Sequence, residues 1–366
     1  MPASRSRPYA DATIGEKVSA ITALLFHMPF VLAWTLLTSP FHINNAHKTW
    51  RRVLSDKFLY FLTVNLSTIQ LQWLNGDSLY VFKNWTKQNG MSALTDDIDE
   101  NTRLLWIGRP RTDRVILYLH GGGFVLPMTD FGLSFWKRTI AELKDRGVDT
   151  GFAIVNYTLV PTAVFPTPLK QAALALNYLI SSGVKPENIQ IVGDSAGGNL
   201  AIQLISHLLH PLNGIPPVKL SAPIRGFYLM SPWTSLSSKG GSLVVNDPND
   251  TTNYRSLAEW GRQVLKGIPD SQRPYIEAIK APKAWFKDAK KVTDRVLITG
   301  GDAECLWDDI VLFADQFCKN HDEAKFVVQK HGVHNDPFFD FLAGETKLGM
   351  LTPIIWEWLT DGFKRS

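Results

Sequence analysis

The chain has 366 residues, of which 45% are hydrophobic and 20% are charged, as in an ordinary globular protein. Its length allows a core that needs no disulfide or metal for stability, and its two cysteines are too few for a disulfide framework. The formal net charge is +4, with no long basic run among aromatic residues. This pattern argues against a nucleic-acid partner.

The N-terminal region is the most hydrophobic part of the chain. Residues 18–39 contain no Asp, Glu, Lys or Arg and are long enough to span a bilayer as a helix, although His27 and Pro29 interrupt the stretch. Two roles stay open for residues 1–109, separately or together: a candidate membrane anchor through 18–39, and a cap on the rest of the protein. The anchor predicts a membrane-associated protein, with the endoplasmic reticulum as one candidate location; the cap alone is compatible with the cytoplasm.

From about residue 110, short β-rich stretches alternate with stretches of helical periodicity. Alternation of this kind predicts an α/β fold with a mostly parallel central sheet and helices on both faces. We expect residues 110–366 to form this α/β domain, with a cap insertion at about 234–290, where the alternation stops. The expected strands lie in 114–120, 151–159, 188–198, 224–233, 294–301 and 324–332, and the expected helices in 169–183, 199–210, 307–319 and 349–361.

Three consecutive glycines follow the first of these strands, in HGGGF (120–124). Such glycines are poor strand formers, but they let backbone N–H groups approach a ligand closely. The tetrahedral oxyanion of an acyl transfer requires donors of this kind. We assign this role to the N–H groups of Gly121 and Gly122 and expect His120 to orient the loop.

The sequence GDSAGG (193–198) fits the pattern G-x-S-x-G, with Ser195 at its centre. A β-rich stretch precedes it and a helical stretch follows, which predicts a tight strand-to-helix turn that exposes the serine hydroxyl. Gly193 and Gly197 suit the crowded backbone of such a turn. The N–H of Ala196 is the expected third oxyanion donor, so these two motifs together predict a nucleophilic serine.

The motifs HGGGF and GDSAGGNLA together resemble those of the hormone-sensitive-lipase-like α/β-hydrolases, a family that includes bacterial esterases, arylacetamide deacetylase and fungal steryl acetyl hydrolases. Residues 157–171 are similar to another family segment, although Thr158 and Thr162 stand where the family has Arg and Glu. The resemblance covers about residues 110–362. It implies the α/β-hydrolase fold and hydrolysis of carboxylic esters.

In this fold the triad follows the chain order serine, acid, histidine. His331 and His334 both follow the last expected strand, and the resemblance favours His334, which directly precedes a proline-containing helix start. Asp302 and Glu304 both follow the strand before it, and in an extended loop they would point the same way. Residue geometry alone therefore leaves both acids open.

The resemblance favours one of the two candidate acids. The family pattern D-P-L-x-D falls on residues 304–308, which places Glu304 at the acid position and Cys305 where the family has proline. Asp302 is the alternative acid. Asp308 and Asp309 are expected to begin the next helix, where acidic side chains suit the helix dipole.

The expected function is hydrolysis of a carboxylic ester through an acyl-enzyme, with deacetylation of a lipophilic ester preferred. One alternative is that the same triad performs acyl transfer, lactonisation or dehydration of a natural product. Another is a non-catalytic receptor for a small ligand on the same fold. The expected partner is a hydrophobic small-molecule ester, and no metal or cofactor is expected.

Overall fold

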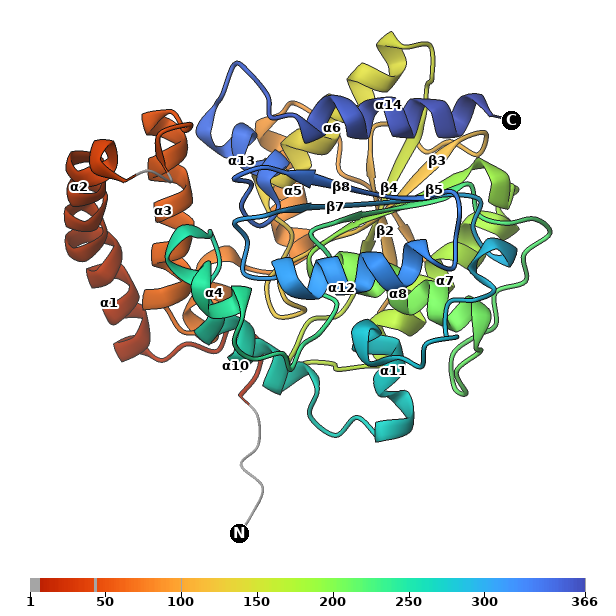
Figure 1. Ribbon diagram of the computed structural model, residues 1–366, viewed down its shortest axis with the longest axis horizontal. Helices are drawn as coiled ribbons and strands as arrows, with labels where there is room; N and C mark the ends of the chain where they lie inside the picture. The colour runs from red at the N-terminus through yellow and green to blue at the C-terminus, as the bar shows by residue number, and fades with distance from the viewer. Residues whose placement is uncertain (1–6, 43–44, 100, 366) are drawn as a thin grey trace.

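An eight-stranded sheet forms the centre of the computed structural model, which describes residues 7–42, 45–99 and 101–365 (Figure 1). The strand order is β1-β2-β4-β3-β5-β6-β7-β8. The strands from β3 to β8 run parallel to one another, whereas β2 is antiparallel to both of its neighbours, β1 and β4. The strands are β1 Leu94–Asp97, β2 Arg103–Ile107, β3 Val115–Leu119, β4 Gly151–Asn156, β5 Ile189–Asp194, β6 Gly226–Met230, β7 Val296–Gly301 and β8 Ala324–Gln329.

Helices cover both faces of the sheet, because its central strands are apolar on both sides and each face must be shielded from water. One face packs on α6 and α14, and the other packs on α7, α8 and α12 (Figure 1). The predicted α/β fold with a mostly parallel sheet is confirmed. These helices are α6 Asp130–Asp145, α7 Thr167–Ser181, α8 Ala196–Leu209, α12 Trp307–Cys318, α13 Asp336–Ala343 and α14 Leu351–Lys364.

The sheet begins earlier in the chain than residue 110. β1 and β2 lie within the segment 1–109, and β2 pairs directly with β4. β1 is short, largely exposed and acidic, so it lacks the continuous apolar pattern that marks the central strands. β2 has four consecutive buried apolar residues, but it is only five residues long and pairs in antiparallel fashion. Both strands are part of the central sheet.

Five α-helices precede the sheet within the part of the chain that the structure describes. A continuous helical segment, Ile14–Phe41, is long and apolar enough to cross a membrane by length and composition, and only 6% of its most hydrophobic window is buried. A π-helical turn, Ala23–His27, lies just before Pro29, whose missing N–H disturbs the regular hydrogen-bond pattern. The helices are α1 Ile14–Thr22, α2 Met28–Thr38, α3 Trp50–Asn65, α4 Thr68–Asn75 and α5 Ser78–Gln88.

The connection between β6 and β7, residues 231–295, contains short helices and turns over the ends of the strands. Its longest helix, α10, presents an apolar side to the protein through Leu257, Trp260 and Val264. The Trp260 indole N–H also donates to the Thr68 hydroxyl on α4 at 3.0 Å, which links this connection to the N-terminal helices. The helices of the connection are α9 Ser242–Val245, α10 Tyr254–Val264 and α11 Arg273–Ile276.

Candidate active site

Ser195 lies on the sharp turn between β5 and α8. Its backbone has φ +52° and ψ −118°, a combination that a residue with a side chain adopts only when its surroundings enforce it. The flanking glycines explain how the turn fits. A Cβ atom on Gly197 would lie 1.9 Å from the Leu119 carbonyl oxygen, and one on Gly193 would lie 2.4 Å from the Gly197 carbonyl oxygen.

His334 and Glu304 form a buried pair on two later loops. His334 Nδ1 lies 2.8 Å from Glu304 Oε2, and the Glu304 side chain is completely buried. The other carboxylate oxygen, Oε1, accepts the Gly301 N–H at 2.7 Å and the Ser231 hydroxyl at 3.0 Å. Three donors therefore hold the Glu304 carboxylate, and the carboxylate in turn fixes the imidazole with its Nε2 free for another partner.

The pair also sets the proton affinity of the imidazole. Burial by itself lowers the pKa of His334, but the hydrogen bond and charge of Glu304, together with the charges of Asp250 and Asp194, raise it above the usual value. The raised pKa means that these carboxylates stabilise the imidazolium, so the imidazole is a stronger base.

The alternative acid and the alternative histidine lie together elsewhere. Asp302 Oδ1 accepts the backbone N–H of His331 at 2.5 Å, and the exposed His331 ring stacks on His47. The loop is not extended as we expected: Glu304 N–H bonds to the Gly301 carbonyl and Trp307 N–H to the Glu304 carbonyl. This turn directs Glu304 inward and leaves Asp302 partly exposed.

One buried residue of the β6–β7 connection joins the two loops that carry the pair. Asp250 Oδ1 accepts the backbone N–H of His334 at 2.8 Å, and its Oδ2 accepts that of Cys305 at 2.7 Å. Burial raises the pKa of this carboxyl group. The sequence analysis missed Asp250, because nothing in a Pro- and Asn-rich stretch indicates a contact with loops that lie 55 and 84 positions later.

The assignment of Gly121 as an oxyanion donor needs correction. Its N–H is already donated to Asp194 Oδ1 at 2.9 Å and is not available to a substrate. Within the described residues, the N–H groups of the next two glycines, Gly122 and Gly123, have no hydrogen-bond acceptor. Both have positive φ angles, +103° and +62°, which only glycine adopts readily. Gly122 and Gly123, not Gly121, are therefore the glycines of this loop with N–H groups available to a ligand, and Ala196 lies at the first position of α8.

Asp194, the residue before the nucleophile, connects three loops. Besides Gly121 N–H, its carboxylate accepts the Tyr118 hydroxyl at 2.6 Å and the Asn335 side-chain N–H at 2.9 Å. Burial raises the pKa of Asp194 to about 6, although these donors oppose the shift. The glycine loop, the serine turn and the histidine loop are thus held by one carboxylate.

His120 orients the glycine loop, as expected. Its Nε2 lies 3.0 Å from the Ser78 hydroxyl and its Nδ1 lies 2.7 Å from the Gly121 carbonyl oxygen. The ring stacks on Tyr157, and burial lowers the pKa of His120 to about 4. The imidazole is therefore neutral near pH 7 and structural in role.

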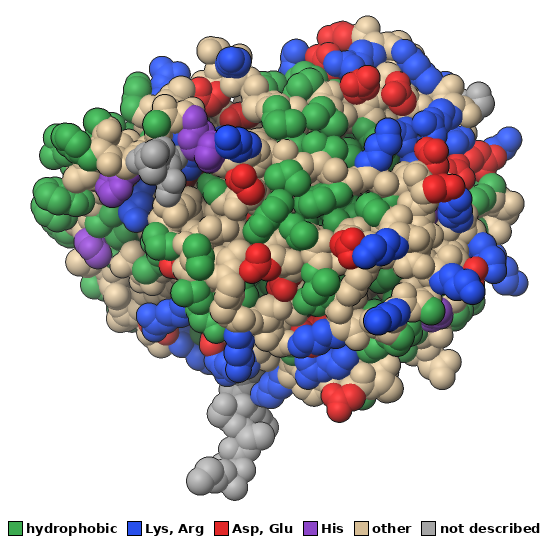
Figure 2. Space-filling model, in the orientation of Figure 1, with side chains coloured by type: hydrophobic (Ala, Val, Ile, Leu, Met, Phe, Trp, Pro, Cys, Tyr) green, Lys and Arg blue, Asp and Glu red, His purple; other side chains and the backbone are tan. Residues whose placement is uncertain are grey.

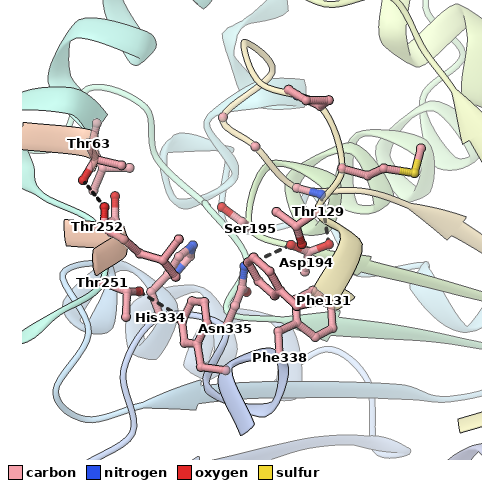
Figure 3. A pocket seen from close by; sticks show the side chains of 18 of the residues that line it. Thr63, Thr129, Phe131, Asp194, Ser195, Thr251, Thr252, His334, Asn335 and Phe338 are labelled. Carbon is pink, nitrogen blue, oxygen red and sulfur yellow. Dashed lines mark hydrogen bonds between the residues drawn. The ribbon is translucent and has the colours of Figure 1, made fainter. Parts of the chain in front are cut away.

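Ser195 and His334 line one cavity of about 140 Å³, together with the glycine loop (Figure 3). Its wall combines aromatic rings from α6 and α13 with threonines from α3 and the β6–β7 connection. In Figure 3, Ser195 lies between His334, Thr251 and Thr252 on one side and Phe131 and Phe338 on the other. The lining residues include Leu59, Thr63, Gly122, Gly123, Phe131, Ser195, Thr251, Thr252, Leu257, Trp260, His334, Asn335, Phe338 and Phe339.

The remaining candidates take structural positions. Asp308 and Asp309 lie in the first turn of α12, as predicted, and accept hydrogen bonds from Ser242 and Ser238. Cys305 is buried, and its burial raises the pKa of the thiol. Among the residues that the structure describes, no three His, Cys, Asp or Glu side chains are grouped so that they could hold a metal ion.

A serine on a strand-to-helix turn, with an acid and a histidine on later loops of a mostly parallel sheet, is the arrangement of the α/β-hydrolases. The chain belongs to this family: the family described as alpha/beta hydrolase fold matches residues 116–337, which is more than half of the chain. The resemblance to hormone-sensitive-lipase-like members, first seen in HGGGF and GDSAGG, agrees with this match.

Several relatives have names that refer to deacetylation. Steryl acetyl hydrolase 1 of Saccharomyces cerevisiae is 26% identical over 252 residues, which are 63% of this chain and 56% of the yeast protein. A Schizosaccharomyces pombe protein named as a steryl acetyl hydrolase is 26% identical over 246 residues, 64% of this chain and 62% of that protein. The chain thus matches less than two thirds of either protein's length. Arylacetamide deacetylase of Bos taurus is 34% identical over 119 residues, 31% of this chain and 28% of the bovine protein.

Solved structures show the same fold. An esterase from the bacterial hormone-sensitive lipase family superposes with a TM-score of 0.66 at 21% identity, covering 86% of this chain and 99% of the esterase. A second structure, of an esterase from a metagenome library, gives a TM-score of 0.64 at 18% identity, covering 84% of this chain and 98% of that protein. At these identities the likeness concerns the fold.

Proposed function

We propose that the protein hydrolyses carboxylic esters through an acyl-enzyme, with Ser195 as nucleophile, His334 as general base and Glu304 as the triad acid. The observation that carries the proposal is the 2.8 Å contact between the His334 ring and the buried Glu304 carboxylate, on the wall of the cavity that Ser195 also lines. A serine hydroxyl is a weak nucleophile unless a base of this kind accepts its proton.

The reaction would proceed in two halves. His334 Nε2 accepts the Ser195 proton as the hydroxyl oxygen attacks the ester carbonyl, and the imidazolium then gives that proton to the departing alcohol. Water, deprotonated by the same nitrogen, hydrolyses the acyl-enzyme and releases the acid. Glu304 keeps the proton of the imidazole on Nδ1 throughout and stabilises the imidazolium.

The oxyanion would be bound by the N–H groups of Gly122, Gly123 and Ala196. The first two have no other acceptor within the described residues, and the third lies at the N-terminus of α8, where the helix dipole favours negative charge. Asp194 holds the preceding residue of the loop through Gly121 N–H and so keeps the donors fixed before the substrate binds.

We propose the acetyl ester of a lipophilic alcohol as the substrate class. The cavity of about 140 Å³ is smaller than the roughly 300–1,000 Å³ of a typical ligand pocket, so a short acyl group suits it better than a long chain. Its aromatic and aliphatic wall suits an apolar alcohol. The names of the two yeast relatives and of the bovine relative, which refer to acetyl esters and arylacetamides, support the same class.

The test is labelling with a fluorophosphonate, followed by hydrolysis of a panel of lipophilic acetates and their longer-chain esters. We expect covalent labelling of Ser195, rapid hydrolysis of the acetates, and loss of both in Ser195→Ala. A protein that is folded but unlabelled at Ser195 contradicts the mechanism. A preference for long acyl chains contradicts the proposed substrate but leaves the mechanism intact.

We also propose that the helical segment Ile14–Phe41 binds a membrane. Hydrophobic side chains gather over α1 and α2 at the edge of the molecule (Figure 2), and Phe26, Phe30 and Trp34 are each more than 60% exposed. Monomeric soluble proteins rarely expose large contiguous apolar patches, which usually mark a binding surface. Phe30→Ser combined with Trp34→Ser is expected to weaken cosedimentation with phosphatidylcholine vesicles, whereas Val244→Ser with Val245→Ser, at exposed positions on α9, is not. Equal cosedimentation of both variants contradicts the proposal.

A further inference from the structure

A buried cluster of charges lies between the N-terminal helices and the helix that follows the general base. Arg52, on α3, donates to three carboxylates: to Asp56 at 2.7 Å, to Asp336 at 2.7 Å and to Asp340 at 2.9 Å. Lys48 also donates to Asp56, at 2.8 Å. All these side chains are less than 10% exposed, so water screens their interactions little.

The cluster reaches the loop that carries His334. Asp336 is the first residue of α13, two positions after the histidine. The same oxygen, Oδ2, that accepts from Arg52 also accepts the backbone N–H of Val333 at 3.0 Å. The Asp336 side chain therefore bonds back to the residue before the histidine and bridges the backbone around His334. Asp340, one turn further along α13, accepts from Arg52 and from the Gly349 N–H. Arg52 therefore holds both the start and the middle of α13.

The helix α3 also joins two other parts of the molecule. It packs against α2 of the apolar N-terminal segment on one side and against α13 on the other (Figure 1). Through Leu59 and Thr63 it lines the cavity that contains Ser195. The Arg52 guanidinium lies 5.5 Å from the ring centre of Phe339, another cavity residue. Helix α3 therefore connects the apolar N-terminal segment with the wall of the cavity.

Arginine suits this position for a geometric reason. Its planar guanidinium offers separate N–H groups to several carboxylates at once, which a lysine ammonium on a flexible stem does not reproduce. Without Arg52, Asp336 and Asp340 would be buried with no ion-pair partner among the described residues, a costly state, whereas Asp56 would keep Lys48. Burial already raises the pKa of Asp340 to about 6. Loss of Arg52 is therefore expected to loosen the α3–α13 contact and the loop that His334 occupies.

We propose that Arg52 is a positioning residue for His334, so that the N-terminal helices form part of the catalytic machinery as well as a membrane-binding segment. The inference rests on the proposed function of the site. Arg52 touches no reacting atom; it acts through Asp336, whose carboxylate holds the histidine loop. Displacement of a catalytic group by about 1 Å can reduce a rate by about 100-fold.

The experiment compares Arg52→Met and Arg52→Lys with Arg51→Met in the full-length chain. Arg51 is the matched control because it is the neighbouring arginine of α3 and is exposed. Among the described residues, its guanidinium makes one hydrogen bond, to the Gly344 carbonyl oxygen at 3.5 Å. For each variant, kcat and KM for a lipophilic acetate are measured per active site titrated with fluorophosphonate. The second-order rate of labelling at Ser195 and the thermal unfolding midpoint are measured as well.

We expect Arg52→Met to reduce kcat and the labelling rate by about 100-fold and Arg52→Lys by about tenfold, with KM changed less than threefold. Arg51→Met should match the wild type. Arg52→Lys keeps the positive charge, so it provides the answer if Arg52→Met does not fold. A merely structural role would lower the unfolding midpoint and leave kcat per titrated site unchanged.

The two proposals fail in different ways. If the wild-type protein neither reacts with fluorophosphonate nor hydrolyses any ester of the panel, the proposed function is wrong. If the wild type reacts but a folded Arg52 variant retains kcat and the labelling rate within about twofold, the positioning role of Arg52 is wrong while the proposed function stands.

Discussion

Replacing Glu304 with glutamine removes the charge of the triad acid while keeping its shape. The structure predicts how the amide would orient. The position of Oε1 receives the Gly301 N–H and the Ser231 hydroxyl, so the amide oxygen must stay there to accept them. The amide NH₂ group then faces His334 Nδ1, at the position where Oε2 now lies 2.8 Å away.

This orientation of the amide selects the opposite tautomer of the His334 ring. A donor facing Nδ1 requires that nitrogen to be an acceptor, so the ring proton moves to Nε2, the nitrogen that should receive the Ser195 proton. The equivalent change in a serine protease reduces kcat by about 10⁴-fold, or about 5 kcal/mol in the activation free energy. We expect a loss of that order for Glu304→Gln. Asp302→Asn should change kcat less than about threefold, because Asp302 bonds to the His331 backbone and not to His334.

The assay is steady-state hydrolysis of a lipophilic acetate, with active sites counted by fluorophosphonate titration at long times and folding checked by the thermal unfolding midpoint. Both variants should be folded. Their kcat values should differ by more than about 1,000-fold, a threshold set tenfold below the loss of about 10⁴-fold expected for Glu304→Gln. The reasoning is refuted if Glu304→Gln retains kcat within about tenfold of the wild type, or if Asp302→Asn is the more damaging exchange.

Two further predictions concern the base and the oxyanion donors. Because the contact with Glu304 raises the pKa of His334 and only the neutral imidazole is a base, kcat/KM should fall with decreasing pH through a midpoint above about 6.5, the usual histidine value; a midpoint below that value in the pH–rate profile contradicts the shift. Gly123→Ala should lower kcat by roughly 10²–10³-fold, since its φ is +62° and a Cβ atom would lie 2.7 Å from Trp260 Cε3. Gly147→Ala, at a φ of +80° with open space around it, should affect folding alone, and equal kcat values for the two variants would argue against Gly123 as a donor.

The parts of the site that follow local rules could be predicted from the sequence. The turn around Ser195 needs small residues at fixed offsets between a strand and a helix, and GDSAGG shows all of these within six positions. The strands from β3 to β7 are mostly apolar and almost wholly buried, which made them recognisable in the sequence, whereas β8 at the sheet edge is only partly buried. The chain order of the fold then restricted the acid and the histidine to two short loops.

The remaining features depend on contacts between distant segments. The turn that separates Glu304 from Asp302 is a matter of backbone direction, and both residues are carboxylates in a polar stretch. Nothing in the sequence distinguishes Gly121 from Gly123 as an N–H donor. They differ in the structure because the Gly121 N–H is already donated to Asp194. Asp250 and Arg52 contact the histidine loop across 84 and 284 positions, and no spacing rule indicates such pairs.

The most direct test of the account is to find where the acyl group resides during turnover. The protein is mixed with an excess of a lipophilic acetate, quenched in acid within the first turnovers and digested for peptide mass spectrometry. The account predicts one acetyl group on the peptide that contains Ser195, and none on the same peptide of Ser195→Ala. Acetate release without an acetylated Ser195 under any quench time, or acetylation at another residue that Ser195→Ala retains at full rate, would contradict it.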